Sequence, residues 1–152
     1  MNWKLIIIGG VIFWLVTNIL GMFVTAPLIH EKVLDPVYQA NESFWRPELR
    51  EDPPDMAALM PQWMLTSFVS SLLVAGIYSL VGGSFSGPGW SRGLKWGLCL
   101  GLFSAMSYFA MSGVFDLPLQ IWIWWGIDAL ILFTLGGAAM GWAGDRFAAT
   151  SS

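Results

Sequence analysis

Charged side chains are scarce in this 152-residue chain: 11% of the residues are Asp, Glu, Lys or Arg, and 56% are hydrophobic. A typical soluble domain carries charge on about 25% of its positions. The formal net charge is −3, so the chain lacks the basic excess that draws proteins to nucleic acids. We therefore expect a membrane protein with the lipid bilayer as its surroundings and no nucleic-acid partner.

The chain is also poor in the residues that hold metals and redox cofactors. It contains one cysteine, Cys99, and one histidine, His30. A single thiol forms no internal disulfide and has no C-x-x-C partner. One histidine without a cysteine cluster argues against haem or a tight metal site, so we predict no metal and no cofactor. A small cluster of His30, Glu31 and Asp35 remains an alternative, although such loop residues are usually just solvated.

Common catalytic motifs are missing as well. The chain has no G-x-S-x-G, no H-E-x-x-H and no glycine loop followed by Lys and Ser or Thr. The glycine-rich segment 82–89 contains Pro88 and is typical of a tight turn. The sequence thus predicts a protein that is not an enzyme, and a membrane enzyme is the least favoured class.

Four apolar segments make up most of the chain. Each is close to the 20 or so residues that a helix needs to cross a bilayer. The fold predicted is all-α, an integral membrane four-helix bundle in a single domain over residues 1–152. The expected spans are residues 5–26, 63–81, 93–113 and 121–142. Several of the ten tryptophans lie near the span ends, as in the aromatic belt of membrane proteins.

The distribution of basic residues predicts the orientation. Four spans place both termini on one side, together with Lys4, Arg92, Lys95 and Arg146. Because basic residues favour the cytoplasmic side, we expect both termini in the cytoplasm and one long extracytoplasmic loop at residues 27–62. That loop holds six prolines, which favour turns over a long helix. Its apolar residues favour docking on the outer mouth of the bundle or on a partner.

Small residues recur every four positions on the second and third spans. The second carries Ser67, Ser71, Ala75 and Ser79, and the third carries Gly93, Gly97, Gly101 and Ala105. Such faces let two helix backbones approach closely in lipid. We therefore predict that spans two and three pack face to face. Gly137 and Gly141 give the fourth span a weaker face of the same kind, and general glycine enrichment of membrane helices is the alternative.

Asp128 is the one acid placed well inside a predicted span. A charged side chain at mid-helix costs at least about 2.5 kcal/mol on insertion scales and usually faces protein or water. Other spans offer polar residues at a similar depth, which predicts a shared polar layer: Asn18, Ser70, Ser71, Ser107 and Tyr108. This layer either fixes the helix register or serves as a proton-linked, ligand-binding or partner-binding site. No basic residue is expected at that depth.

Three short motifs, Pro36–Tyr38, Phe44–Pro47 and Arg92–Gly97, resemble a group of short bacterial four-span membrane proteins without an assigned activity. The resemblance implies a four-helix fold in the bacterial cytoplasmic (inner) membrane and supplies no catalytic residue. Within the second motif we predict a clasp, in which Arg46 engages loop acids while Trp45 wedges at the membrane interface.

Two functions follow from these features. The leading one is a non-enzymatic accessory or structural subunit, held in a larger membrane complex or a homo-oligomer, because the chain is small and has extensive small-residue faces. The alternative is a small transporter or binding protein for an apolar ligand, a lipid or a proton-linked solute. Its site would be the polar layer around Asp128.

Overall fold

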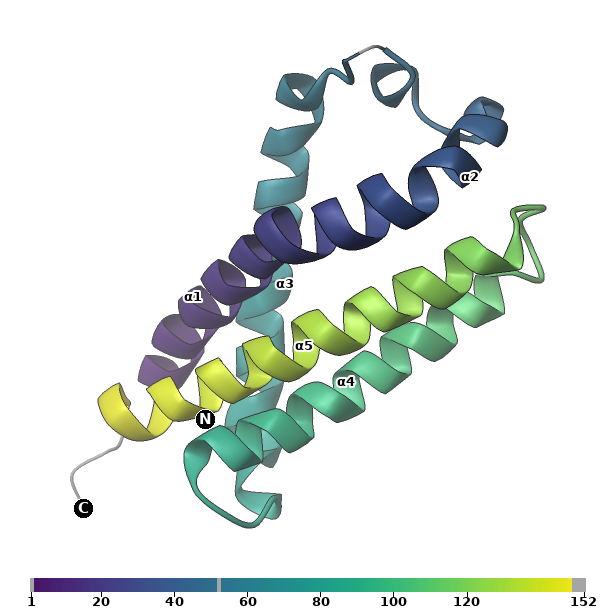
Figure 1. Ribbon diagram of the computed structural model, residues 1–152. Helices are drawn as coiled ribbons and strands as arrows, with labels where there is room; N and C mark the ends of the chain where they lie inside the picture. Colours follow the sequence, from purple (N-terminus) through teal and green to yellow (C-terminus); the bar gives the residue numbers. More distant parts are fainter. Residues whose placement is uncertain (1, 52, 149–152) are drawn as a thin grey trace.

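The computed structural model describes residues 2–51 and 53–148, and all regular elements in this part of the chain are helices (Figure 1). The long ones are α1 (Trp3–Leu20), which continues through η1 (Gly21–Leu34) into α2 (Asp35–Ala40), then α3 (Met56–Val81), α4 (Gly89–Met111) and α5 (Leu119–Phe147). These make four continuous helices that are long and apolar enough to cross a membrane. The prediction of an all-α chain with four helices able to span a membrane is confirmed at this level.

The connection between the first two spans is shorter than predicted. The first helix runs unbroken from Trp3 to Ala40, and α3 already begins at Met56, where Asp55 Oδ1 caps the Ala58 amide at 3.2 Å. The loop is therefore residues 41–55, with two 3-10 turns, η2 (Glu42–Phe44) and η3 (Pro47–Leu49). The prediction that prolines keep residues 27–62 from forming a long helix was wrong.

Pro27 lies inside η1, which is a π-helix. In an α-helix, proline removes one hydrogen bond and clashes with the carbonyl four residues before it. A π-helix bonds five residues apart, and its wider turn relieves that clash. The buried residues of η1, Thr25, Ile29 and Leu34, are spaced by four and five positions, wider than the α-helical period of about 3.6. The helix consequently continues past Pro27 with a different face toward the protein.

The helices pack in the order α4, α5, α1, α3, so that α5 and α1 lie in the middle (Figure 1). The short connection at residues 112–118 makes α4 and α5 antiparallel neighbours, as the sequence predicted. By contrast, α3 and α4 follow each other in the chain but do not form one of the packed helix pairs within the described residues. All four helices nevertheless share one core cluster, in which Phe13 of α1, Tyr78 of α3 and Met140 of α5 are buried and Trp96 of α4 packs against them.

The face-to-face pairing predicted for the small-residue stripes was therefore wrong. The glycines of α4 face α5: a Cβ at Gly93 would strike the Gly137 carbonyl, and one at Gly101 would lie 3.0 Å from Leu130 Cα. Because Gly137 also lacks a side chain, two bare backbones can meet here, which explains why α5 is preferred over the serine-rich α3. Ala105 belongs to this interface and packs near Gly126.

The α3 stripe packs chiefly on α1 instead. Ser67 Oγ accepts a hydrogen bond from Trp14 Nε1 at 2.9 Å, and Ser71 is buried beside Gly10. Ala75 is buried in a core cluster with Phe13 of α1, and the Ser79 hydroxyl donates to the Gly76 carbonyl of its own helix.

The first and last described residues, Asn2 and Ala148, lie at one end of the helices, here called the termini end. Asn2 Nδ2 donates to the Ala148 carbonyl at 2.9 Å, and the α4 N-terminus joins them because the Gly89 amide donates to Asp145 Oδ2 at 2.6 Å. The loop at residues 41–55 and the connection at 112–118 lie at the opposite end (Figure 1). The two described ends thus share a side, while the compartment on that side stays a prediction.

The α4–α5 contact leads to the first prediction. We expect Gly97→Ala to destabilise the protein by about 1–3 kcal/mol, the usual range for overpacking. The new Cβ would strike the Phe133 carbonyl and lie 3.0 Å from Thr134 Cα. Gly76→Ala is the matched control, because nothing lies within 4 Å of a Cβ at that position. Thermal unfolding in mild detergent measures both, and equal stability of the two variants would contradict the close backbone contact.

Candidate functional site: a histidine–aspartate pair between the first helix and α5

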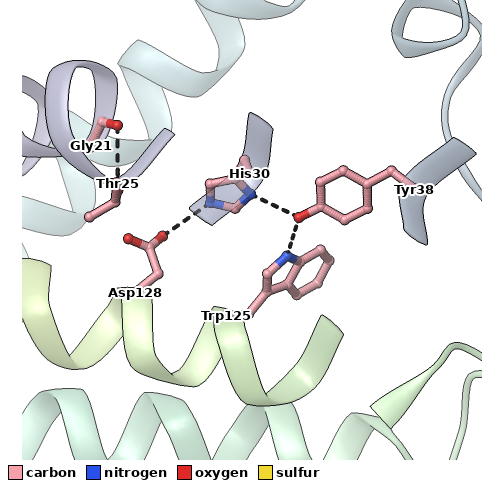
Figure 2. A network of polar contacts seen from close by, with 6 residues as sticks. All are labelled: Gly21, Thr25, His30, Tyr38, Trp125 and Asp128. Carbon is pink, nitrogen blue, oxygen red and sulfur yellow. Dashed lines mark hydrogen bonds and ion pairs between the residues drawn. The ribbon is translucent and has the colours of Figure 1, made fainter. Parts of the chain in front are cut away.

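Asp128 on α5 lies opposite His30 on η1 (Figure 2). His30 Nε2 and Asp128 Oδ2 are 3.4 Å apart, and their side chains are 33% and 18% exposed. That separation is slightly longer than the usual range of about 2.7–3.2 Å for an N–H to oxygen hydrogen bond, so the two groups form a weak contact. The pair joins segments that are 98 residues apart in the chain. The expectation that no basic residue lies at the depth of Asp128 was therefore wrong.

A second set of hydrogen bonds holds the other edge of the imidazole. His30 Nδ1 lies 2.8 Å from the Tyr38 hydroxyl, and Trp125 Nε1 donates to the same hydroxyl at 2.7 Å (Figure 2). An indole nitrogen can only donate, so the Tyr38 oxygen is an acceptor toward Trp125. Its own proton is free to go to His30 Nδ1, which leaves Nε2–H to donate to Asp128. This assignment gives a continuous chain from Trp125 to Asp128.

The same network can also hold a second imidazole proton. With both ring nitrogens protonated, His30 Nδ1 becomes a donor, and the Tyr38 oxygen accepts from His30 and Trp125 together. Only the direction of one hydrogen bond changes. The imidazole can therefore gain or lose a proton without moving any heavy atom of the network.

Aromatic and aliphatic side chains pack around this network on the side of the 41–55 loop. Trp45 Nε1 donates to the Tyr38 carbonyl at 2.8 Å, and the two rings meet edge to face at 5.1 Å. Trp122 is 3% exposed and packs edge to face on Trp125. A buried cluster of Ile29, Leu34 and Ile121 lies alongside. These side chains cover one side of the network, while a third of the His30 side chain stays exposed.

Asp128 Oδ1 is buried and has no hydrogen-bond partner among the described residues. Buried polar atoms in proteins nearly always have a partner, so an unpaired carboxylate oxygen calls for an explanation. Oδ1 can accept a hydrogen bond from a ligand or carry a proton itself. Asp128 Oδ1 is therefore the atom of this site that can bind a ligand or a proton.

The polar layer predicted from the sequence is not shared by four helices. Serine and asparagine can bond to the carbonyls of their own helix, and these do so. Asn18 Nδ2 donates to the Trp14 carbonyl, Ser71 Oγ to that of Ser67, and Ser107 Oγ to that of Phe103. Ser70 and Ser107 are exposed to the surroundings of the helices. Of the six candidates, Asp128 is in the network and Tyr108 touches it, with its ring 5.8 Å from Trp125.

The predicted clasp residues have separate roles. Trp45 packs into the aromatic cluster against Tyr38 and Trp125 and so carries the loop back onto the helices. Arg46 pairs with Glu48 on the exposed side, with Nη2 and Oε1 3.0 Å apart. The hydrogen bond from Arg46 holds the pKa of the Glu48 carboxyl below its usual value. Any stabilisation from this pair is present above the ordinary pKa of Glu48 and is lost as pH falls through the lowered one.

The residues that sequence reasoning missed are His30, Tyr38 and Trp125. His30 and Tyr38 were assigned to the long loop, where His30 was considered only with Glu31 and Asp35, and Trp125 was given no role of its own. Within the described residues, no group of three or more His, Cys, Asp or Glu side chains could hold a metal ion. Asp35, expected near His30, accepts instead from Gln39 Nε2 at 2.8 Å.

The hydroxyl of Tyr38 gives the second prediction. Tyr38→Phe leaves His30 Nδ1 and Trp125 Nε1 without their shared partner, and we expect a loss of about 1–3 kcal/mol in the free energy of unfolding. Tyr108→Phe is the control, because it keeps the ring contact with Trp125 and should change stability little. Thermal unfolding with tryptophan emission as the readout compares the two. A similar effect of both variants would argue against the hydrogen-bonded chain.

Comparisons with models of protein families, with curated proteins and with solved structures each return no match. The interpretation of the His30–Asp128 site therefore rests on its own chemistry: an ionisable pair held by Tyr38 and Trp125 within apolar helices. A function has to be inferred from what that pair can bind.

Proposed function

We propose that this chain is a small multi-pass membrane protein that binds or transports a proton-linked solute or lipid, with His30 and Asp128 as its working groups. The observation that carries the proposal is the His30–Asp128 pair, held between two candidate membrane-spanning helices. Ionisable residues inside membrane helices are costly and usually mark ion, proton or ligand pathways. Imidazole is also the side chain that changes charge most readily near physiological pH.

The energetics favour a working role for the pair over a purely structural one. Packed apolar side chains of similar volume would hold η1 against α5 at least as well, because a buried ion pair seldom repays its desolvation. Such side chains already lie beside it, namely Ile29, Leu34 and Ile121. Helix packing alone therefore does not require an ionisable pair here.

The surroundings of the pair suggest what the ligand looks like. Asp128 Oδ1 offers an acceptor to a polar or cationic head group. The aromatic rings of Tyr38, Trp45 and Trp125 would surround such a head group, since cations are attracted to ring faces. An apolar body would lie among the neighbouring aliphatic side chains or in the lipid. The ligand class is thus a molecule with one polar head and an apolar remainder.

Substitution of the pair tests the proposal in cells. In the organism that encodes the protein, Asp128→Asn and His30→Gln should reproduce the phenotype of a deletion while the protein accumulates normally. Both substitutions keep the side-chain size and remove the ionisation. Asp116→Asn is the matched control, because Asp116 is an exposed acid in the connection between α4 and α5. Normal growth and normal accumulation of Asp128→Asn would refute a working role for the pair.

A pH titration tests the proton chemistry directly. Because Trp125 and His30 share the Tyr38 hydroxyl, a change in imidazole charge alters the surroundings of the indole. In lipid nanodiscs, we expect wild-type tryptophan emission to show a transition with pH that is absent from His30→Gln and retained in Asp116→Asn. A transition that persists in His30→Gln would have another origin, and the proton-linked reading would fail.

A membrane accessory or structural subunit is the second candidate, and a surface feature favours it. A wide apolar groove of about 560 Å³ lies between α1 and α3, lined by residues such as Leu72, Leu73 and Ile77. Such an exposed apolar face can be covered by lipid chains or by another helix. Native mass spectrometry of the tagged protein in mild detergent separates the two functions. Stoichiometric partner chains would favour the subunit, whereas a bound small molecule or lipid without partners would favour the binding protein.

A further inference from the structure

A polar cavity of about 190 Å³ lies at the termini end, away from His30 and Asp128. Four helix ends meet there: the start of α1, the end of α3, the start of α4 and the end of α5. Its polar lining includes Asn2, Tyr78, Ser79, Arg92 and Asp145, and glycines form much of the remaining wall. Drug-sized ligands usually occupy pockets of about 300–1,000 Å³, so this cavity suits a smaller chemical group.

Arg92 is the cation of the cavity. Its Nη2 donates to Asp145 Oδ1 at 2.5 Å, and its Nε has no partner among the described residues. A guanidinium has five N–H donors, and since Nε is buried, the donors left for a ligand are those of the two terminal nitrogens that Asp145 does not use. Asp145 is already occupied, because its other oxygen accepts from the Gly89 amide at 2.6 Å. The carboxylate is thus held by Arg92 and the start of α4, and it orients the guanidinium at the cavity wall.

The charged side chains that line the cavity are Arg92 and Asp145, whose formal charges cancel, so the excess of positive charge that would attract an anion comes from residues around it. The termini end carries Lys4, Lys95 and Arg146 in addition to Arg92, against the single acid Asp145. Lys4 and Arg146 are exposed, and Lys95 Nζ donates to the Ser86 carbonyl at 2.8 Å. Basic residues just outside a membrane span attract the anionic head groups of lipids. This cavity lies where the apolar helices end, which is the level of those head groups.

The geometry points to a phosphate-binding site in this cavity, with Arg92 as the main ligand and Asn2 and Tyr78 as further donors. A guanidinium is positively charged and attracts the negative phosphate. Its planar N–H groups can also donate two parallel hydrogen bonds to two phosphate oxygens. The phosphate would belong either to the head group of a phospholipid or to a free phosphate compound. This site does not include the His30–Asp128 pair, so a test of one proposal does not decide the other.

Native mass spectrometry of the full chain in detergent tests the site with three probes. They are phosphatidylglycerol, a galactosyl diacylglycerol that lacks phosphate, and inorganic phosphate. We expect phosphatidylglycerol to bind at least about tenfold more tightly than the galactolipid, the range typical of one well-placed charged contact. Displacement of the bound lipid by millimolar inorganic phosphate would identify a free phosphate compound as the ligand, whereas failure to displace it would identify the phospholipid.

Variants assign the binding to the cavity. Arg92→Gln should remove the preference for phosphatidylglycerol, and Arg92→Lys should keep part of it because the charge remains. Arg146→Gln is the matched control, since it removes an exposed charge at the same end. If Arg92→Gln does not fold, Tyr78→Phe provides a milder loss of one donor. Equal binding of the two lipids by the wild type, or equal losses in the Arg92 and Arg146 variants, would overturn the site.

Discussion

The continuation of the first helix through Pro27 is the constraint on which the candidate site depends. Proline would end or kink an α-helix there, but the wider hydrogen-bonding pattern of η1 lets the chain proceed. The altered turn brings His30 opposite Asp128 and carries Tyr38 to Trp125. The Trp45 ring then docks on Tyr38 and draws the loop onto the helices. A helix that stopped at Pro27 would leave Asp128 without His30 as its partner.

Most polar side chains in this protein bond either within their own helix or to a distant segment, as Trp14 does to Ser67. Serines, threonines and Asn18 bond to the carbonyls of their own helices, which requires no other element. His30–Asp128 and Arg92–Asp145 join distant segments instead, and both leave a buried polar atom without a partner among the described residues. Long-range pairs of this kind depend on the tertiary fold. They are also where a ligand can complete the hydrogen bonding.

The two centres lie toward opposite ends of α5. On the side of the 41–55 loop, aromatic rings pack around an imidazole and a carboxylate that lie 3.4 Å apart. At the termini end, a guanidinium that stays charged faces a small polar cavity. The His30–Asp128 pair is of the kind that proton-linked binding would use, whereas the Arg92 guanidinium would bind an anion. Between them, the glycine contact of α4 with α5 supplies a rigid backbone support.

The sequence by itself indicated a lipid bilayer as the surroundings of the protein and an all-α fold. Runs of about 20 apolar residues leave the helix as the structure that satisfies the backbone in lipid, so four helices followed from composition and length. It also marked Asp128 as unusual, because charge inside such a run is costly. These conclusions depend on properties that neighbouring residues share along the chain.

The tertiary structure alone decided which helices touch and which side chain meets Asp128. The stripes on α3 and α4 were both visible in the sequence, but only the fold shows that Gly93 meets Gly137, where neither helix has a side chain, while α3 packs on α1. The contact of His30 with Asp128 was not predicted, because the segment of His30 was assigned to a loop. The buried residues around it also do not follow the α-helical period. Which helices pack together depends on the fit between two helix surfaces and on local helix geometry. The periodicity of a single segment contains neither.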